Sequence, residues 1–323
     1  MEKTSEYENE KSVLIRGTSK CARFFICDTT EIVKKAKAIH NLDPIGTMIF
    51  GKFITVAGMI GKDLKGEGDL VTLRITGDGP YGNMLATGNS KGEVKGYMGD
   101  PSGKLHQIID EKGDFIVDDT GKIRFIGNGT FQMIKDMGLK EPFSGMIQLE
   151  DEDMGDIIAD YFFLSDQIKS AVSLGVKLDE AGEVIKAGGY IIQLLPGVEE
   201  GFIDKLEDKL RQIRSITELL AGGFTLERIA DLLYEDISVE ENEALMEGAH
   251  KKVYVEDFEI LEKSFIEYKC NCSREKYFKG VLTLGKKEID EILEEEGKIQ
   301  VECHFCGKKY EFIKSDFNDW SQN

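Results

Sequence analysis

The chain of 323 residues is long enough for about two domains, and its 41% hydrophobic and 31% charged residues are typical of a globular protein that buries a core. Its formal net charge of −19 argues against binding to nucleic acid, whose phosphates are neutralised by Lys and Arg, and against binding to an anionic membrane surface. The N-terminal "MEKTSEYENE" has no apolar stretch and the apolar window 48–61 is too short to span a bilayer, so we expect a cytoplasmic protein without a secretory signal.

The first two hundred residues predict a mixed sheet with helices packed on it. A strand region over 13–30 precedes a helix over 29–40, which Thr29 or Thr30 caps, and a buried helix is expected over 51–62. In "LVTLRIT", apolar and polar residues alternate as in a half-buried strand. Gly-rich turns follow, and further strands are expected at "KIRFIG", "FSGMIQL", "DYFFL" and "GGYIIQLLPG".

Beyond Pro196 the apolar residues recur at three- and four-residue steps, which predicts an amphipathic helix over 203–220. Gly222 and Gly223 end this helix, and Thr225 caps a second one in "LERIADLLY". In residues 235–267 acidic side chains far outnumber lysines, and like charges at helical spacing are destabilising. We interpret this segment as a linker with weak structure of its own; the alternative is a solvated surface helix.

Two further patterns bear on catalysis. "GDGPYG" (77–82) fits G-x-G-x-x-G after a strand, but a dinucleotide site needs a helix next, whereas Pro80 and the following strand-like residues predict a tight turn. The histidines are scattered and no nucleophile–base pair stands out, so we expect no catalytic residue and no enzyme; they are His40, His106, His250 and His304.

The most specific pattern is a pair of cysteine doublets near the C-terminus. Cys270 and Cys272 form C-x-C, and Cys303 and Cys306 form C-x-x-C about thirty residues later. In the cytoplasm such clusters bind metal or act in redox chemistry more often than they form structural disulfides. Two close pairs separated by a folded-back segment are the layout of a four-thiolate zinc site.

The residues between the doublets support a small metal-stabilised domain. "YFKGVLTLG" is strand-like, "KKEIDEILEEEGK" predicts a helix, and "KIQV" and "KKYEF" predict strands. Gly307 supplies the permissive backbone of a metal knuckle. A unit this small with so few apolar residues usually needs a covalent or metal cross-link.

Other interpretations of the cysteines are weaker. Four unrelated buried thiols would not need this spacing, and a thioredoxin-type enzyme would place one C-x-x-C at the start of a helix. His304 could be a ligand, but four thiolates already complete the shell, so an exposed histidine is expected. Cys21 and Cys27 are core or surface thiols without an assigned role. The two thiols of C-x-C are close enough to join each other, which makes the site a candidate switch.

The chain resembles the heat shock protein 33 (33 kDa chaperonin) family of redox-regulated chaperones. The matching stretches are "VTLRITGDGPYGNMLATGNSKGEVKGYM", "FFLSDQIKSAVSLGVKL", "AGGYIIQLLPG" and the tail with "LGKKEIDEILEEEGKIQVECHFC". Two departures are an apparently longer linker around "EGAHKKVYVEDFEILEK" and an acidic extension before Ser12.

The resemblance implies an α+β protein in three parts: a mixed-sheet domain with packed helices over 1–222 for client binding and dimerisation, a metastable helical linker over 223–267, and a zinc-binding redox-switch domain over 268–323. It further implies an ATP-independent holdase that is inactive with one Zn²⁺ per chain. Oxidation would form the disulfides Cys270–Cys272 and Cys303–Cys306, release zinc and unfold the linker. The protein, as a homodimer, would then bind unfolding or oxidatively damaged clients.

Two other functions remain as alternatives. A zinc-ribbon interaction module would keep its structural zinc at all times, and nucleic acid as its partner is disfavoured by the charge. A thiol–disulfide oxidoreductase would turn over catalytically, whereas the holdase would show only stoichiometric thiol chemistry.

Overall fold

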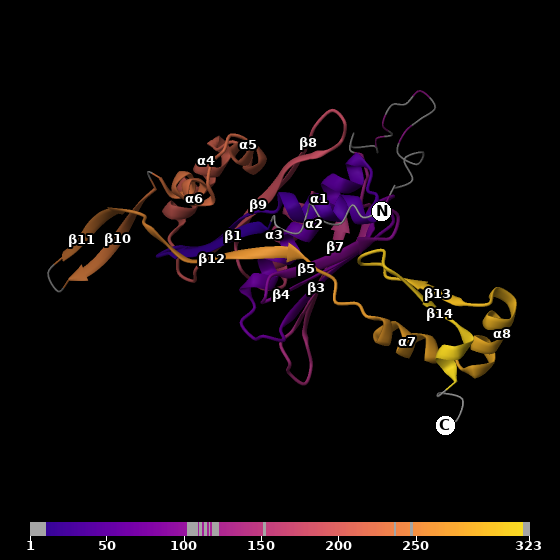
Figure 1. The fold of residues 1–323 in the computed structure, drawn as a ribbon. Coiled ribbons are helices and arrows are strands. Elements are labelled where there is room, and N and C mark those ends of the chain that lie inside the picture. Colours follow the sequence, from indigo (N-terminus) through magenta and orange to yellow (C-terminus); the bar gives the residue numbers. More distant parts are fainter. Residues whose placement is uncertain are drawn as a thin grey trace. The chain divides into compact units, whose positions relative to one another are not determined.

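The computed structural model describes residues 11–101, 109, 112, 115, 117, 123–150, 153–235, 237–245 and 248–318, and over 238–255 it describes the backbone alone. These residues fall into two compact units, of which the first ends at Tyr268 and the second begins at Lys269. We call them the sheet unit and the cysteine unit. Both contain helices and strands, as expected for an α+β protein (Figure 1).

A ten-stranded mixed sheet forms the frame of the sheet unit, in the order β7-β6-β3-β4-β5-β12-β1-β2-β9-β8. Neighbouring strands are antiparallel except β12 and β5, which pair in parallel through Glu267 with Glu93 and Tyr268 with Val94. The strands are β1 (Ser12–Ser19), β2 (Ala22–Asp28), β3 (Leu70–Gly77), β4 (Asn83–Asn89), β5 (Glu93–Met98), β6 (Asn128–Asp136), β7 (Phe143–Glu150), β8 (Ser170–Leu178), β9 (Val184–Leu194) and β12 (Phe258–Tyr268).

Helices cover both faces of this sheet. Side chains alternate across it, so Leu14 and Phe25 enter a core with α1 (Thr30–His40), α2 (Pro44–Asp63) and α3 (Met154–Leu164). Their neighbours Ile15 and Phe24 enter a second core with α4 (Glu200–Gln212), α5 (Ile216–Ala221) and α6 (Leu226–Tyr234), which group together in Figure 1. The apolar residues of the predicted strands and helices thus fill two separate cores.

Helix α2 is the central helix of the first core and is longer than the predicted 51–62. Asp43 caps it by accepting from the Gly46 N–H at 2.6 Å, and Pro44 fits the first helical position. The helix is long and apolar enough to cross a membrane, but 72% of its apolar window is buried in the protein, as in a core helix. A Cβ on Gly88 would lie 2.0 Å from the Ala57 carbonyl oxygen, so glycine lets β4 approach the helix closely.

Most predicted elements of this unit are confirmed. The structure contains the helix over 29–40, the strands at "LVTLRIT", "FSGMIQL" and "GGYIIQLL" and the capped helix "LERIADLLY", as α1, β3, β7, β9 and α6. "GDGPYG" is a tight turn, in which the Gly77 N–H donates to the Gly82 carbonyl at 2.6 Å. The described residues of "KIRFIG" are not a strand; their carbonyls accept from this turn, at 2.9 Å from the Gly79 N–H.

Two further predictions need correction, one of a strand and one of a helix. "DYFFL" is the end of α3 rather than a strand, because Asp153 caps a helix whose apolar residues Ile157, Ile158 and Tyr161 face the core. The predicted helix over 203–220 is two helices, α4 and α5. Residues 213–215 interrupt it, since Ser215 and Glu218 form a capping box that starts α5.

The region 223–267, expected to be a helical linker, contains one helix and three strands in its described residues. After α6, β10 (Ser238–Leu245) and β11 (Gly248–Val255) form a separate hairpin. β12 then enters the large sheet between β5 and β1, and its pairing with β1 runs from Phe258 to Ile266. Its side chains alternate in burial, a period-two pattern that the many acidic residues concealed. The acidic extension, apart from Lys11, lies outside the described residues.

The cysteine unit is small. It consists of α7 (Arg274–Leu282), α8 (Lys286–Glu296), the antiparallel pair β13 (Ile299–Glu302) and β14 (Lys309–Phe312), and a 3₁₀ helix over Lys314–Phe317. The predicted helix "KKEIDEILEEE" and both predicted strands are confirmed. "YFKGVLTLG" lies in α7 as far as Leu282 instead, because Ser273 caps a helix there by accepting from the Lys276 N–H. The buried core of the cysteine unit consists of Val281, Ile289, Ile299, Tyr310, Phe312 and Phe317.

Candidate metal centre

The four cysteines of the two doublets come together from two loops of the cysteine unit. Cys270 and Cys272 lie in the irregular segment that leads into α7, and Cys303 and Cys306 lie in the turn between β13 and β14. Two doublets about thirty residues apart in the sequence therefore face each other in space, as their spacing predicts.

A tight backbone turn positions the second doublet. The N–H groups of Cys306 and Gly307 donate to the Cys303 carbonyl at 3.2 and 2.8 Å, and the Cys303 N–H donates to the Lys308 carbonyl at 2.9 Å. Gly307 has φ +67°, a left-handed conformation that suits glycine. The permissive backbone expected at Gly307 is therefore present, and it lets the chain reverse between β13 and β14.

The sulfur atoms have the spacing of a tetrahedral metal site. All four Sγ atoms lie within 4.8 Å of one another. The Sγ atoms of Cys270 and Cys303 are 3.7 Å apart, and those of Cys272 and Cys306 are 3.4 Å apart. Zinc–sulfur bonds of about 2.3 Å in a tetrahedron place neighbouring sulfurs about 3.8 Å apart. The donor set therefore fits a metal ion bound by four thiolates.

Burial and hydrogen bonds act differently on the individual thiols. Cys303 is buried, at 1% exposure, and the other three cysteines are partly buried. Burial raises the pKa of Cys270 and of Cys306. Burial also acts upward on Cys303, but hydrogen bonds from the Tyr277 hydroxyl and the Phe305 N–H outweigh it and lower the pKa of Cys303 to about 7.

Two tyrosines that the sequence analysis did not single out contact the cluster. The Tyr310 hydroxyl donates to Cys272 Sγ at 3.1 Å. The Tyr277 hydroxyl makes a hydrogen bond with Cys303. In the sequence, Tyr277 and Tyr310 follow the two doublets by a few residues each, a spacing that becomes informative only when α7 and β14 are known to lie beside the sulfurs.

Among the residues whose side chains the structure describes, the other cysteines and the histidines are not part of the centre. His304 is exposed and, among the described residues, is not one of the clustered ligand atoms, as expected. Cys21 and Cys27 are buried in the sheet unit. Burial raises the pKa of Cys27, which keeps it a thiol and chemically inert. Of the scattered histidines, His106 and the side chain of His250 lie outside the described residues.

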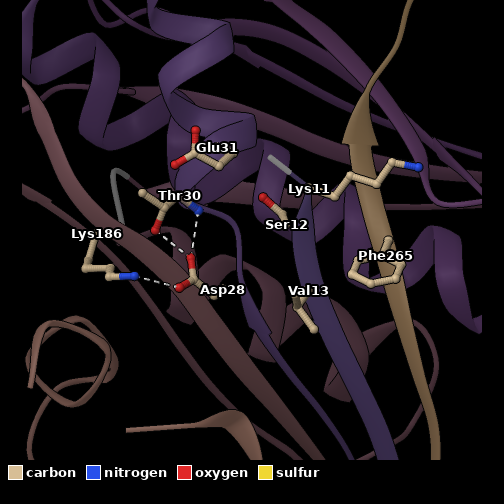
Figure 2. A pocket seen from close by; sticks show the side chains of 8 residues that line it. All are labelled: Lys11, Ser12, Val13, Asp28, Thr30, Glu31, Lys186 and Phe265. Carbon is tan, nitrogen blue, oxygen red and sulfur yellow. Dashed lines mark hydrogen bonds and ion pairs between the residues drawn. The ribbon is translucent and has the colours of Figure 1, made fainter. Parts of the chain in front are cut away.

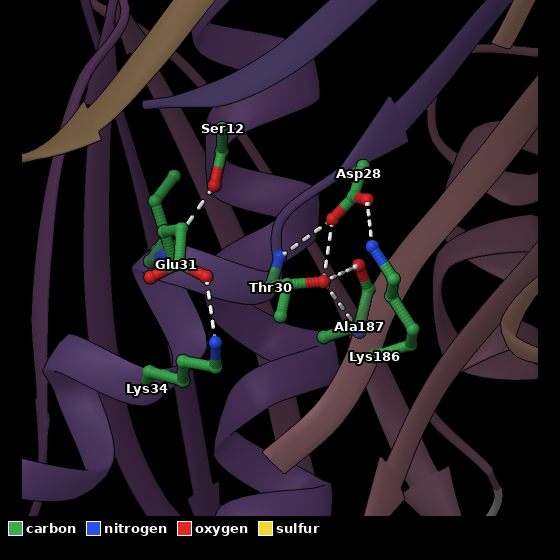
Figure 3. A network of polar contacts seen from close by, with 8 residues as sticks. Ser12, Asp28, Thr30, Glu31, Lys34, Lys186 and Ala187 are labelled. Atoms are coloured by element: carbon green, nitrogen blue, oxygen red, sulfur yellow. Dashed lines mark hydrogen bonds and ion pairs between the residues drawn. The ribbon is translucent and has the colours of Figure 1, made fainter. Parts of the chain in front are cut away.

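A second polar site lies in the sheet unit, where a pocket of about 480 Å³ opens beside the start of α1 (Figure 2). Several of its polar groups already have hydrogen-bond partners. Asp28 accepts from the Thr30 N–H and from Lys186 Nζ, each at 3.0 Å, and Ser12 Oγ accepts from the Ile32 N–H at 3.3 Å (Figure 3). These bonds tie the first turn of α1 to β1, β2 and β9, so we interpret the network as structural.

The chain is similar to known proteins over most of its length. A family profile described as "Hsp33 protein" matches residues 13–313. A protein of Caldanaerobacter subterraneus subsp. tengcongensis named 33 kDa chaperonin is 41% identical over 287 residues, which cover 88% of this chain and 89% of that protein. A 33 kDa chaperonin of Ruminiclostridium cellulolyticum is 37% identical over 92% of each chain. The crystal structure of a 33 kDa chaperonin (heat shock protein 33 homolog) from Thermotoga maritima is 28% identical with a TM-score of 0.77, and the match covers 97% of this chain and 98% of that one.

Proposed function

The chain belongs to the Hsp33 family of chaperones, and from this membership we propose that it is a holdase whose client binding is switched on by oxidation. In the reducing cytoplasm its cysteines hold one zinc ion per chain and the protein does not bind clients. Peroxide or hypochlorite, under unfolding conditions, joins Cys270 to Cys272 and Cys303 to Cys306 and releases the metal. The oxidised protein, as a homodimer, binds unfolding proteins without ATP, and we assign it no catalytic role.

The observation that carries this proposal is the cluster of four sulfurs within 4.8 Å. Four thiolates in a tetrahedral arrangement are the donor set of structural zinc, and soft thiolate ligands disfavour magnesium and calcium. Zinc needs the sulfurs as thiolates, and the thiolate is also the form that oxidants attack. The same four atoms therefore serve both as metal ligands and as the sensor.

The small core of the cysteine unit explains why oxidation would have a large structural effect. Only six described side chains of this unit form its buried core. Bound zinc supplies a cross-link between the segment before α7 and the β13–β14 turn, worth about 10–16 kcal/mol in small zinc-binding units. Whole domains are stable by about 5–15 kcal/mol. We infer that disulfide formation, which withdraws the ligands, unfolds this unit.

We further propose that residues 1–222 bind clients and dimerise, that 223–267 act as a metastable linker, and that 268–323 are the switch. The acidic composition of 223–267 and the exposed apolar side chains of β12 support this division. Leu261 and Phe265 are 57% and 60% exposed. The position of β12 in the sheet sets a condition: release of the linker must break its pairing with β1, which extends from Phe258 to Ile266.

The proposal is tested on full-length protein that has been reduced and loaded with zinc. Peroxide at raised temperature should release one zinc per chain with the loss of four thiols, and the treated protein alone should suppress light scattering by a thermally unfolding client. A Cys21→Ala/Cys27→Ala variant, which keeps all four clustered thiols, should behave like the wild type. If the reduced and oxidised proteins suppressed light scattering equally, the proposed redox switch would be wrong, although the protein would still act as a chaperone.

The same samples separate the two alternatives. Zinc retained through peroxide treatment, with all four thiols still titratable, would favour a zinc-binding interaction module with a constant metal. Repeated turnover in a disulfide-reduction assay would favour an oxidoreductase. Stoichiometric thiol loss without turnover is the outcome expected for the holdase.

A further inference from the structure

The two tyrosines beside the sulfur cluster form a pair that joins it to the core of the cysteine unit. Tyr277 comes from α7 and Tyr310 from β14, and their rings stack with centroids 5.0 Å apart and an interplanar angle of 25°. Tyr310 is a buried member of the small core, with 5% exposure, and Tyr277 packs against that core. The rings are therefore held in place by packing on both sides of the centre.

Each hydroxyl reaches one sulfur of a different doublet. Tyr310 donates to Cys272 of C-x-C at 3.1 Å, and Tyr277 bonds to Cys303 of C-x-x-C. Cys272 and Cys306 are the closer pair of sulfurs at 3.4 Å, and Cys270 and Cys303 are the other pair at 3.7 Å. One phenol thus lies at each of these two sulfur pairs.

Resting on the proposed redox switch, we propose that the hydroxyls of Tyr277 and Tyr310 are positioning donors that hold the thiolates of Cys303 and Cys272 in the metal-binding arrangement and slow their oxidation by peroxide. A hydrogen bond to a thiolate is charge-assisted and draws electron density away from sulfur. A sulfur with less charge is a weaker nucleophile but still a metal ligand.

The reaction that these donors slow is the first step of thiolate oxidation by hydrogen peroxide. A thiolate gives an electron pair to one peroxide oxygen, the O–O bond breaks and hydroxide leaves, so sulfur becomes a sulfenic acid. The second thiolate of the doublet then attacks that sulfur, a second hydroxide leaves, and the S–S bond forms. The two sulfurs lose two electrons and peroxide is reduced to two hydroxide ions. The phenol opposes the first step because the attacking lone pair is the one it binds.

The same contacts carry the effect of oxidation into the fold. When Cys272 becomes part of a disulfide, the buried Tyr310 hydroxyl loses a charged acceptor. Tyr310 is opposite Val301 in the β13–β14 pair, so a shift of its ring disturbs the hairpin that carries Cys303 and Cys306. The tyrosines therefore both restrain the switch and couple it to unfolding.

The test compares Tyr310→Phe, Tyr277→Phe and the double variant with wild type, all as full-length, reduced, zinc-loaded protein. Phenylalanine keeps the ring and removes only the hydroxyl. Tyr234→Phe is the matched control, since it removes a buried phenol that belongs to the sheet unit. Zinc release to a chromogenic chelator and thiol loss are followed at one fixed peroxide concentration.

We expect each single variant to release zinc about three- to tenfold faster than wild type, the double variant faster still, and the control at the wild-type rate. In cobalt-substituted protein the sulfur-to-cobalt charge-transfer bands should shift in both tyrosine variants and not in the control, a change that loss of packing alone does not produce. Far-UV circular dichroism of the reduced proteins shows whether each variant is folded. If one single variant is unfolded, the comparison with wild type rests on the other single variant.

Wild-type oxidation rates with unshifted cobalt bands in folded variants would overturn the role of the tyrosines. That result differs from failure of the proposed function. If the tyrosine variants release zinc faster but the oxidised protein binds no client, the role of the tyrosines holds and the holdase function is wrong. If the oxidised protein binds clients but the variants behave like wild type, the holdase function holds and the role of the tyrosines is wrong.

Discussion

The sheet unit and the cysteine unit bury very different amounts of apolar surface. In the sheet unit, helices pack on both faces of ten strands, and fully buried rings such as Phe50 and Phe131 fill the first core. In the cysteine unit, six buried side chains lie beside a cluster of four sulfurs. Because apolar burial does not depend on redox state and thiolate ligation does, only the cysteine unit is expected to respond to oxidants. One chain can thus combine a unit whose fold is independent of redox state with a unit whose fold depends on it.

The strongest test of this contrast removes the metal or one ligand. We expect chelation of zinc, or Cys303→Ser, to unfold the cysteine unit, because about 10–16 kcal/mol of metal-binding free energy is lost. Amide hydrogen exchange should show loss of protection over α7, α8 and the β13–β14 pair, with protection in α1 and α2 unchanged. Cys27→Ala serves as the control, since that thiol lies in the sheet unit. A protected cysteine unit in the fully reduced, metal-free protein would contradict the comparison.

Truncating one core residue in each unit tests the contrast between the two units further. Phe131 and Phe312 are both fully buried, one in each unit. We expect Phe131→Ala and Phe312→Ala each to lower the free energy of unfolding of its own unit by about 3–5 kcal/mol. Urea unfolding and zinc release, measured on the same samples, should distinguish destabilisation of the sheet unit from destabilisation of the cysteine unit. Phe312→Ala should speed zinc release, and equal acceleration by Phe131→Ala would show that the units are not independent.

The smallest expected effect concerns pH. Burial lowers the pKa of His40, whose Nε2 lies 3.0 Å from the Tyr268 hydroxyl, which itself donates to the Gly96 carbonyl at 2.9 Å. The unfolded chain therefore binds more protons below about pH 6.5. The stability that neutral His40 contributes to the sheet unit should be complete above that pH. Below it, the free energy of unfolding should fall by up to about 1.4 kcal/mol for each pH unit, until the folded-state pKa is reached.

Thermal or urea unfolding between pH 7.5 and pH 5 measures this dependence. A His40→Gln variant should have a flatter profile, since it keeps a polar side chain that does not titrate. Profiles of equal slope for the two proteins would show that His40 is not the group responsible.

The sequence predicts the sulfur cluster well because both doublets are local patterns with a known metal geometry. Tight turns such as "GDGPYG" are likewise set by neighbouring residues. Short apolar runs are ambiguous, and "DYFFL" becomes helical because the cap at Asp153 and the core face of α3 decide its conformation. The place of β12 between β1 and β5, and the bond from Tyr310 to Cys272 across 38 residues, depend on long-range pairing that no local pattern encodes.

Strand β12 is also the only strand in the described structure whose pairing joins two smaller sheets. On one side of it lie β7, β6, β3, β4 and β5, and on the other lie β1, β2, β9 and β8. If this strand were withdrawn, β1 would lose its ladder partner from Ser12 to Ser19, and β5 would lose its partners only at Glu93 and Val94. An open strand edge of this kind can pair with an extended polypeptide through main-chain groups.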